Sequence, residues 1–170
     1  PASFTKSISA SVLGIPVIAI VAIIVALILA FLTIKTKLGR NIYALGGNKE
    51  SAWYSGINVK LHTLIVFIIS GLCAGIAGIV LLGRVGSAEP AAATGFETYA
   101  IAAAIIGGTS FFGGKGKIHG VVVGGLIIGV INYGMNILSL SSTLQQVVMG
   151  ALIIGSVALD RFVGSKNTSK

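Results

Sequence analysis

Charge is the scarcest property of this sequence. Charged residues make up 9% of the 170 residues, and only four of them are acidic. Soluble globular domains carry about 25% charged residues, which solvate their surfaces. This chain has 55% hydrophobic residues and a mean hydropathy of +1.00, so it cannot cover a soluble surface with polar groups. The composition excludes an ordinary soluble domain and predicts an outer surface that faces lipid.

Cysteine and a leader sequence are also lacking. Cys73 is the single cysteine and lies inside an apolar run, which excludes a disulfide framework and a cysteine-based metal site. The chain begins at Pro1 without an initiator Met or the pattern of a cleavable signal peptide. We therefore expect the sequence to be part of a longer protein.

The net charge of +8 raises the question of nucleic-acid binding. The basic residues, however, occupy short loops between long apolar runs and form no patch on a soluble fold. We therefore expect membrane lipid, and no nucleic acid, among the partners.

Five apolar segments dominate the pattern. A helix needs about 20 apolar residues to cross the hydrocarbon core. The third segment is shorter and rich in Ala and Gly, so it fits a thin span, a re-entrant segment or a broken helix. We predict an all-α, polytopic helical membrane protein with about five membrane segments, at 15–34, 64–83, 99–112, 118–138 and 144–159.

The basic residues also predict the orientation, because Lys and Arg stay in cytoplasmic loops. With five crossings, the outer pieces hold only Lys6 and Arg84, and the other 10 of the 12 basic residues lie in inner pieces. This arrangement puts the N-terminus of the chain outside and its C-terminus in the cytoplasm. If the third segment did not cross, every later loop would change sides. The inner pieces are 35–60, 113–117 and 160–170.

Small and polar residues mark the faces where the segments are expected to pack. Close helix contacts in lipid form at small residues, and three small-xxx-small patterns occur, at 71–75, 120–124 and 125–129. Spacings of four, three and four place Gly125, Gly129, Asn132 and Asn136 on one stripe. The stripe is either a packing face held by amide hydrogen bonds or a wall of a polar pathway, and in both cases it must face protein or water.

Acidic and hydroxyl residues give further candidates for that pathway, namely Glu97 and Thr109. Glu97 also flanks the outer end of the third segment together with Glu89, with Arg84 nearby. These charges either form a rim that engages an extracellular binding protein or are ordinary solvated loop charges.

The inner loop 35–60 predicts a short helix. Asn48 suits an N-cap, Glu50 then lies in the first turn, and Gly56 suits the C-cap of a helix over 49–55. Gly46 and Gly47 before it would allow a backbone reversal. An alternative is an amphipathic helix on the lipid headgroups, with Trp53 and Tyr54 as interface anchors.

The loop sequence Gly39-Arg-Asn-Ile-Tyr-Ala-Leu-Gly-Gly-Asn48 resembles that of ribose-type ABC transporter permeases. Further similar stretches are 50–52, 55–57, 95–97, 100–103, 107–110 and 113–116. The chain departs from the usual family pattern at Ser51, Trp53 and Tyr99, where the family has Ala, Arg and Asp.

The resemblance implies a permease about twice this length, of which residues 1–170 form the C-terminal half. It also implies that the loop helix is the coupling helix, which docks in a groove of a cytosolic ATPase. The coupling positions carried over from the family are Gly46, Gly47, Asn48, Glu50, Ala52, Ser55, Gly56 and Ile57.

The predicted function is that of a non-enzymatic permease subunit of a bacterial plasma-membrane importer for a ribose-like simple sugar. The chain has no Walker motif, so ATP and Mg²⁺ would be bound by the ATPase partner and no cofactor by this chain. The other expected partners are a second permease copy or homologue and an extracellular or periplasmic sugar-binding protein. A nucleoside, a branched-chain amino acid or a sugar-derived signal are alternative cargoes. A passive channel or a membrane enzyme would be a different class of protein.

Overall fold

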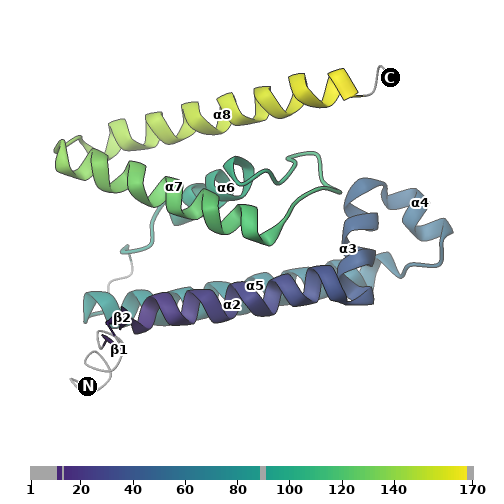
Figure 1. The fold of residues 1–170 in the computed structure, drawn as a ribbon, viewed down its shortest axis with the longest axis horizontal. Helices are drawn as coiled ribbons and strands as arrows, with labels where there is room; N and C mark the ends of the chain where they lie inside the picture. The colour runs from purple at the N-terminus through teal and green to yellow at the C-terminus, as the bar shows by residue number, and fades with distance from the viewer. Residues whose placement is uncertain (1–10, 13, 89–90, 168–170) are drawn as a thin grey trace. The chain divides into compact units, whose positions relative to one another are not determined.

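The computed structural model describes residues 11–12, 14–88 and 91–167 (Figure 1). They divide into two compact units, one formed by the described residues up to 45 and within 49–94, and the other by 46–48 and the described residues from 95 onward. The elements are β1 (Ser11–Val12), β2 (Ile15–Pro16), α2 (Val17–Lys35), α3 (Lys37–Gly47), α4 (Lys49–Tyr54), α5 (Val59–Val85), α6 (Phe96–Ile106), α7 (Ile118–Ile137) and α8 (Ser142–Asn167). β1 and β2 are two-residue strands that pair Val12 with Ile15. The other elements of the described residues are all helices, as predicted.

Three of the described helices are long and apolar enough to cross a membrane, namely α2, α5 and α7. They confirm the helices predicted over 15–34, 64–83 and 118–138. α5 begins at Val59, earlier than the apolar run, because the Asn58 side chain accepts a hydrogen bond from the Leu61 N–H at 3.1 Å. It ends at Gly86, whose φ of 79° stops the helix.

The third segment is only partly helical. α6 has 11 residues, about 16 Å of helix, whereas the hydrocarbon core is about 30 Å thick. It ends in a turn in which Gly108 has a φ of 83°. The segment 99–112 is therefore not one continuous helix, and a re-entrant segment and a broken helix are the two predicted forms that fit.

The fifth segment forms α8, which runs beyond the predicted 144–159 at both ends. It has 26 residues, and its part over Ser142–Ala158 is apolar. Helices thus occur at all five predicted places in the described chain, and the number of membrane crossings stays a prediction.

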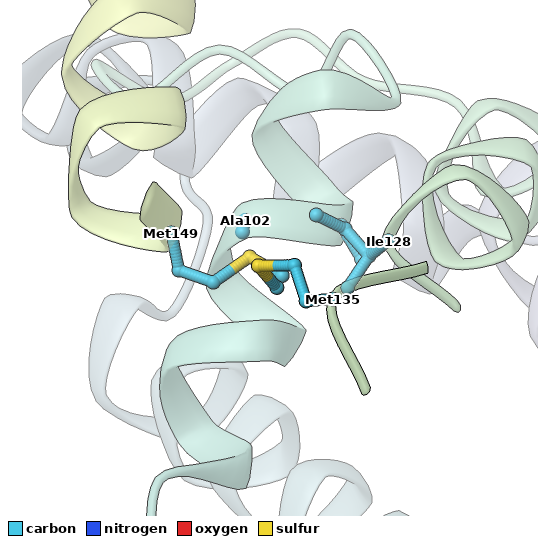
Figure 2. Packing of buried hydrophobic residues seen from close by; sticks show 5 residues of the cluster. Ala102, Ile128, Met135 and Met149 are labelled. Atoms are coloured by element: carbon cyan, nitrogen blue, oxygen red, sulfur yellow. The ribbon is translucent and has the colours of Figure 1, made fainter. Parts of the chain in front are cut away.

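The second unit is built around α6, which packs against both α7 and α8. Ala102 of α6 and Met149 of α8 are fully buried, with Ile128 and Met135 of α7 beside them (Figure 2). The small alanines of α6 leave room for the flexible methionine side chains, which fill the space between the helices.

Glycines let α7 approach the backbone of α6. A Cβ added at Gly120 would meet the carbonyl of Gly107, and one at Gly124 would meet the carbonyl of Ala103 and lie 2.8 Å from the Gly107 nitrogen. The 120–124 pattern is therefore a packing motif. A Cβ at Gly125 would meet nothing within 4 Å in the described chain, and the same holds for Gly71, Gly75 and Gly129.

Gly124 and Gly125 provide a matched test of this packing. Gly124→Ala should lower the free energy of unfolding by about 1–3 kcal/mol, because the added methyl group meets backbone that cannot rotate away. Gly125→Ala should leave it unchanged or raise it by about 0.5–1 kcal/mol, as Ala does in a helix. Thermal unfolding of the purified proteins in detergent measures both, and equal stability of the two variants would contradict this packing.

Candidate functional site

The loop 35–60 holds two helices, not the single one predicted. α3 begins after Thr36, whose Oγ1 accepts a hydrogen bond from the Gly39 N–H at 3.2 Å. Gly39 is buried because α3 starts close to the end of α2, where an added Cβ would lie 2.6 Å from the Leu32 carbonyl oxygen. The signal for α3 was present in the sequence, since Thr36 is a good N-cap.

α4 matches the predicted coupling helix closely, spanning Lys49–Tyr54 with Glu50 in its first turn. Asn48 is the one residue between α3 and α4, at the expected N-cap position. Gly56 has a φ of 80°, its N–H donates to the Trp53 carbonyl at 2.9 Å, and the Ile57 N–H donates to the Ala52 carbonyl at 3.0 Å. These two bonds form a Schellman motif.

The Schellman motif explains why four of the predicted coupling positions lie together. Ala52, 3% exposed, forms the buried side of the turn, and Ser55 closes it by donating from its Oγ to the Ser51 carbonyl at 2.8 Å. Gly56 supplies the left-handed residue and Ile57 the final hydrogen bond. These residues fix the shape of α4 and its exit toward α5.

The exposed face of α4 is aromatic. Trp53 and Tyr54 are 63% and 80% exposed, and their rings meet edge to face with centroids 5.0 Å apart. A groove of about 670 Å³ runs beside them, lined also by Lys49, Glu50 and Lys60. An exposed aromatic pair with charges at its rim suits a protein contact as well as a headgroup contact.

A histidine joins α3 to α5 within the first unit. The His62 Nδ1 lies 2.8 Å from the Asn58 carbonyl oxygen, which can only accept, so Nδ1 donates. The Nε2 then accepts from the Asn41 side-chain amide at 3.0 Å. No local pattern indicates this pairing, because His62 and Asn41 are 21 residues apart along the chain.

The predicted backbone reversal at Gly46 and Gly47 is wrong. They are the last two residues of α3, which runs to Gly47, and neither has a positive φ. Their lack of a side chain serves a close contact within the second unit: a Cβ on Gly46 would lie 2.8 Å from the Gly114 nitrogen.

That contact is made by a tight turn after α6, within residues 110–115. Gly113 and Gly114 have φ values of 90° and 72°, and the Ser110 N–H donates to the Lys115 carbonyl at 2.9 Å. The Ser110 Oγ donates to the Asp160 Oδ2 at 3.0 Å, which ties the turn to α8. Thr109 lies under the turn, since a Cβ at Gly116 would be 3.0 Å from its Oγ1.

The polar stripe of α7 ends in an amide network. The Asn136 Nδ2 donates to the Asn132 carbonyl at 2.8 Å, and the Gln145 Nε2 lies 3.5 Å from the Asn136 Oδ1. Gln145 also donates to the Leu140 carbonyl at 3.0 Å, which holds the turn between α7 and α8. Gln145 was not among the predicted residues, although a glutamine at the start of an apolar segment was a signal for it.

The stripe is not the packed face of α7 in the described chain. Gly124, Ile128 and Met135 are buried, whereas Gly125, Gly129 and Asn136 are exposed, and Asn132 is half-buried. Under both the packing and the pathway interpretation, this exposed stripe of α7 must face additional protein or water.

The structure does not bring all four pathway candidates together. Glu97 is exposed in the first turn of α6, and Thr109 supports the turn after it. In the described residues, no hydrogen bond joins either of them to Asn132 or Asn136. Of the predicted outer rim, Glu89 lies outside the described residues.

Comparison with known proteins gives a family match over residues 1–157, to the family described as "Branched-chain amino acid transport system / permease component". The D-allose transport system permease protein AlsC of Escherichia coli K12 is 67% identical over 94% of this chain and 49% of its own length. The ribose import permease protein RbsC of Bacillus subtilis is 46% identical over 88% of this chain and 46% of its own length. The xylose transport system permease protein XylH of Haemophilus influenzae is 42% identical over 86% of this chain and 39% of its own length.

The chain spans about half the length of these curated relatives. No solved structure matches it significantly. The predicted resemblance to monosaccharide permeases is confirmed by the relatives named allose, ribose and xylose permeases. The chain therefore belongs to the permease family described as "Branched-chain amino acid transport system / permease component".

Proposed function

We propose that this chain is the ATPase-coupling part of a permease subunit in an ABC importer for a simple sugar. The observation that carries the proposal is α4, a short helix closed by a Schellman motif on the loop between the apolar helices α2 and α5. A passive channel has no use for such a helix with an exposed aromatic face.

The proposed mechanism begins at α4. A cytosolic ATPase would bind the face that carries Trp53 and Tyr54, with ATP and Mg²⁺ held by the ATPase alone. α4 is linked to α3 through Asn48 and to α5 through residues 55–58, so displacement of α4 pulls on both neighbouring helices. Two such subunits would then alternate a central cavity between the two sides of the membrane.

The proposed cargo is a monosaccharide. Relatives named as permeases for D-allose, ribose and xylose favour a sugar over a branched-chain amino acid, although the family description names the latter. D-Allose is the first sugar to test, because the identity to AlsC, 67%, is much higher than the 46% to RbsC. A binding protein outside the membrane would deliver the sugar.

The amide groups at the end of α7 are proposed to line the path of the sugar. Amides offer both donors and acceptors, which sugar hydroxyl groups require. Asn132 has a half-buried side chain, and Asn136 is oriented by Gln145. Glu97 and Thr109 are weaker candidates, because neither belongs to this amide network.

The proposed topology is the five-crossing one, with the N-terminus of the chain outside and its C-terminus in the cytoplasm. Within the second unit, the turn at 113–114 contacts both the end of α3 and, through Ser110, Asp160 of α8. If loop 35–60 is cytoplasmic, this turn is too, and the third segment must cross. It would do so as α6 followed by irregular backbone, which is tolerated at membrane depth where protein covers it.

Glu50 and Glu97 form a matched pair for testing the coupling helix. Both are exposed carboxylates in the first turn of a short helix, but only Glu50 lies on α4. In the complete transporter, Glu50→Arg should weaken co-purification of the ATPase by about tenfold, which corresponds to about 1.4 kcal/mol. It should reduce sugar-stimulated ATP hydrolysis in parallel, whereas Glu97→Arg should leave co-purification intact.

The shape of α4 is tested in the same assay at Gly56. Gly56→Val should act like Glu50→Arg, because a β-branched residue is disfavoured at a φ of 80°. Gly56→Asn should be tolerated, because Asn adopts left-handed backbone more readily. Unchanged co-purification and ATP hydrolysis in both Glu50→Arg and Gly56→Val would overturn the coupling role.

The amide path predicts a separate phenotype. Asn136→Ala and Asn132→Ala should reduce the rate of sugar uptake by about tenfold through loss of hydrogen bonds worth about 1–1.5 kcal/mol. Co-purification of the ATPase should not change. Gln145→Ala should resemble Asn136→Ala, whereas Gln146→Ala, at the exposed neighbouring position, should not. Normal uptake in Asn132→Ala and Asn136→Ala would exclude the two asparagines from the path.

A further inference from the structure

The turn after α6 meets the end of α3 backbone to backbone, inside the second unit. A Cβ at Gly114 would lie 2.7 Å from the Gly47 Cα, and one at Gly113 would meet the Gly46 carbonyl oxygen. Two glycine pairs therefore face each other with no side chain between them. Because backbone cannot change rotamer to relieve a collision, movement of one pair toward the other must displace the other pair.

The turn is internally rigid. Besides the bond from the Ser110 N–H to Lys115, the Gly113 N–H donates to the Ser110 carbonyl at 3.2 Å. The Phe112 N–H also lies 3.3 Å from the Ser110 Oγ. Ser110 thus organises the turn with its N–H, its carbonyl and its hydroxyl group.

The same hydroxyl group connects the turn to α8. The Ser110 Oγ donates to the Asp160 carboxylate at 3.0 Å, a hydrogen bond to a charged acceptor and therefore a strong one. α8 in turn packs on α6 through Met149 and Ala102. The turn is thus held by α3 at one point and by α8 at another.

The covalent chain completes the connection to α4. Gly47 ends α3, Asn48 follows, and α4 begins at Lys49. Any displacement of α4 therefore reaches the glycine contact through a single residue. A hollow of about 580 Å³ beside the contact, lined by Gly47, Phe112, Lys115 and Asp160 among others, leaves room for the turn to move.

We propose that the turn Ser110–Lys115 is a relay that carries movement of α4 into the α6–α8 part of the permease. Gly46, Gly47, Gly113 and Gly114 form its contact, and the Ser110–Asp160 hydrogen bond passes the movement to α8. These are positioning residues, since they act through other elements and touch neither sugar nor ATP. The proposal rests on the proposed function of α4 as the coupling helix.

Gly114 and Gly108 are the matched pair that tests the relay. Both have a positive φ, 72° and 83°, so an alanine at either position meets the same backbone strain. Only Gly114 touches α3, because a Cβ at Gly108 would meet nothing within 4 Å. The variants Gly114→Ala, Gly108→Ala, Gly46→Ala and Asp160→Leu would be compared in the complete transporter reconstituted in proteoliposomes.

Three quantities separate the relay from other roles: ATPase co-purification, thermal stability, and the number of sugar molecules imported per ATP hydrolysed. Gly114→Ala, Gly46→Ala and Asp160→Leu should lower the sugar-to-ATP ratio by about fivefold or more, the range typical of coupling between sites. Co-purification of the ATPase with Gly114→Ala and Asp160→Leu should stay within about twofold of the unmodified protein. Gly108→Ala should keep the sugar-to-ATP ratio of the unmodified protein. Asp160→Asn keeps an acceptor for Ser110, so it should lower this ratio less than Asp160→Leu does.

Equal sugar-to-ATP ratios in Gly114→Ala and Gly108→Ala would overturn the relay. A loss of ATPase binding in Gly114→Ala would also overturn it, and so would a fall in the sugar-to-ATP ratio that is fully explained by a loss of thermal stability. Failure of the proposed function gives a different result. In that case Glu50→Arg would leave ATPase binding and ATP hydrolysis unchanged, whatever the glycine variants do.

Discussion

Close contact between backbones at glycine is the interaction on which the second unit depends. Lipid tails are as apolar as leucine side chains, so helices in a bilayer gain little by burying apolar groups against one another. Their association depends on many weak dispersion contacts, which require short distances. At Gly120 and Gly124, α7 comes so close to α6 that a single added carbon atom would collide with backbone.

This constraint allows the third segment to be short and irregular. The backbone after α6 has its own hydrogen bonds, from the N–H groups of Gly107, Gly108 and Thr109 to carbonyls of α6 at 2.9–3.0 Å. The same close approach recurs where the following turn meets the end of α3. The packing of α7 on α6, the irregular third segment and the proposed relay therefore all depend on glycines that lie directly against backbone.

The helices that depend only on neighbouring residues could be predicted from the sequence. Apolar length identified α2, α5 and α7, and the cap residues Asn48 and Gly56 identified α4 almost to its ends. Three of the features that sequence reasoning missed join distant positions: the contact of Gly46 with Gly114, the bond from Ser110 to Asp160, and the bond between Asn41 and His62. A pair of glycines in a sequence is compatible with a backbone reversal and also with a close contact between two backbone segments. The sequence alone does not show which applies, because the contacting segment is far away along the chain.

In the proposed topology, the third segment crosses the membrane. The turn after α6 then lies on the same side of the membrane as α4. Single cysteines at Tyr54, Lys115 and Arg84, all exposed positions, would be introduced into a Cys73→Ser background of the complete transporter. A membrane-impermeant maleimide applied to intact cells and to inside-out vesicles then reports the side of each. We expect Tyr54→Cys and Lys115→Cys to react only in inside-out vesicles and Arg84→Cys to react only in intact cells. Reaction of Lys115→Cys in intact cells, with Tyr54→Cys protected there, would contradict this topology.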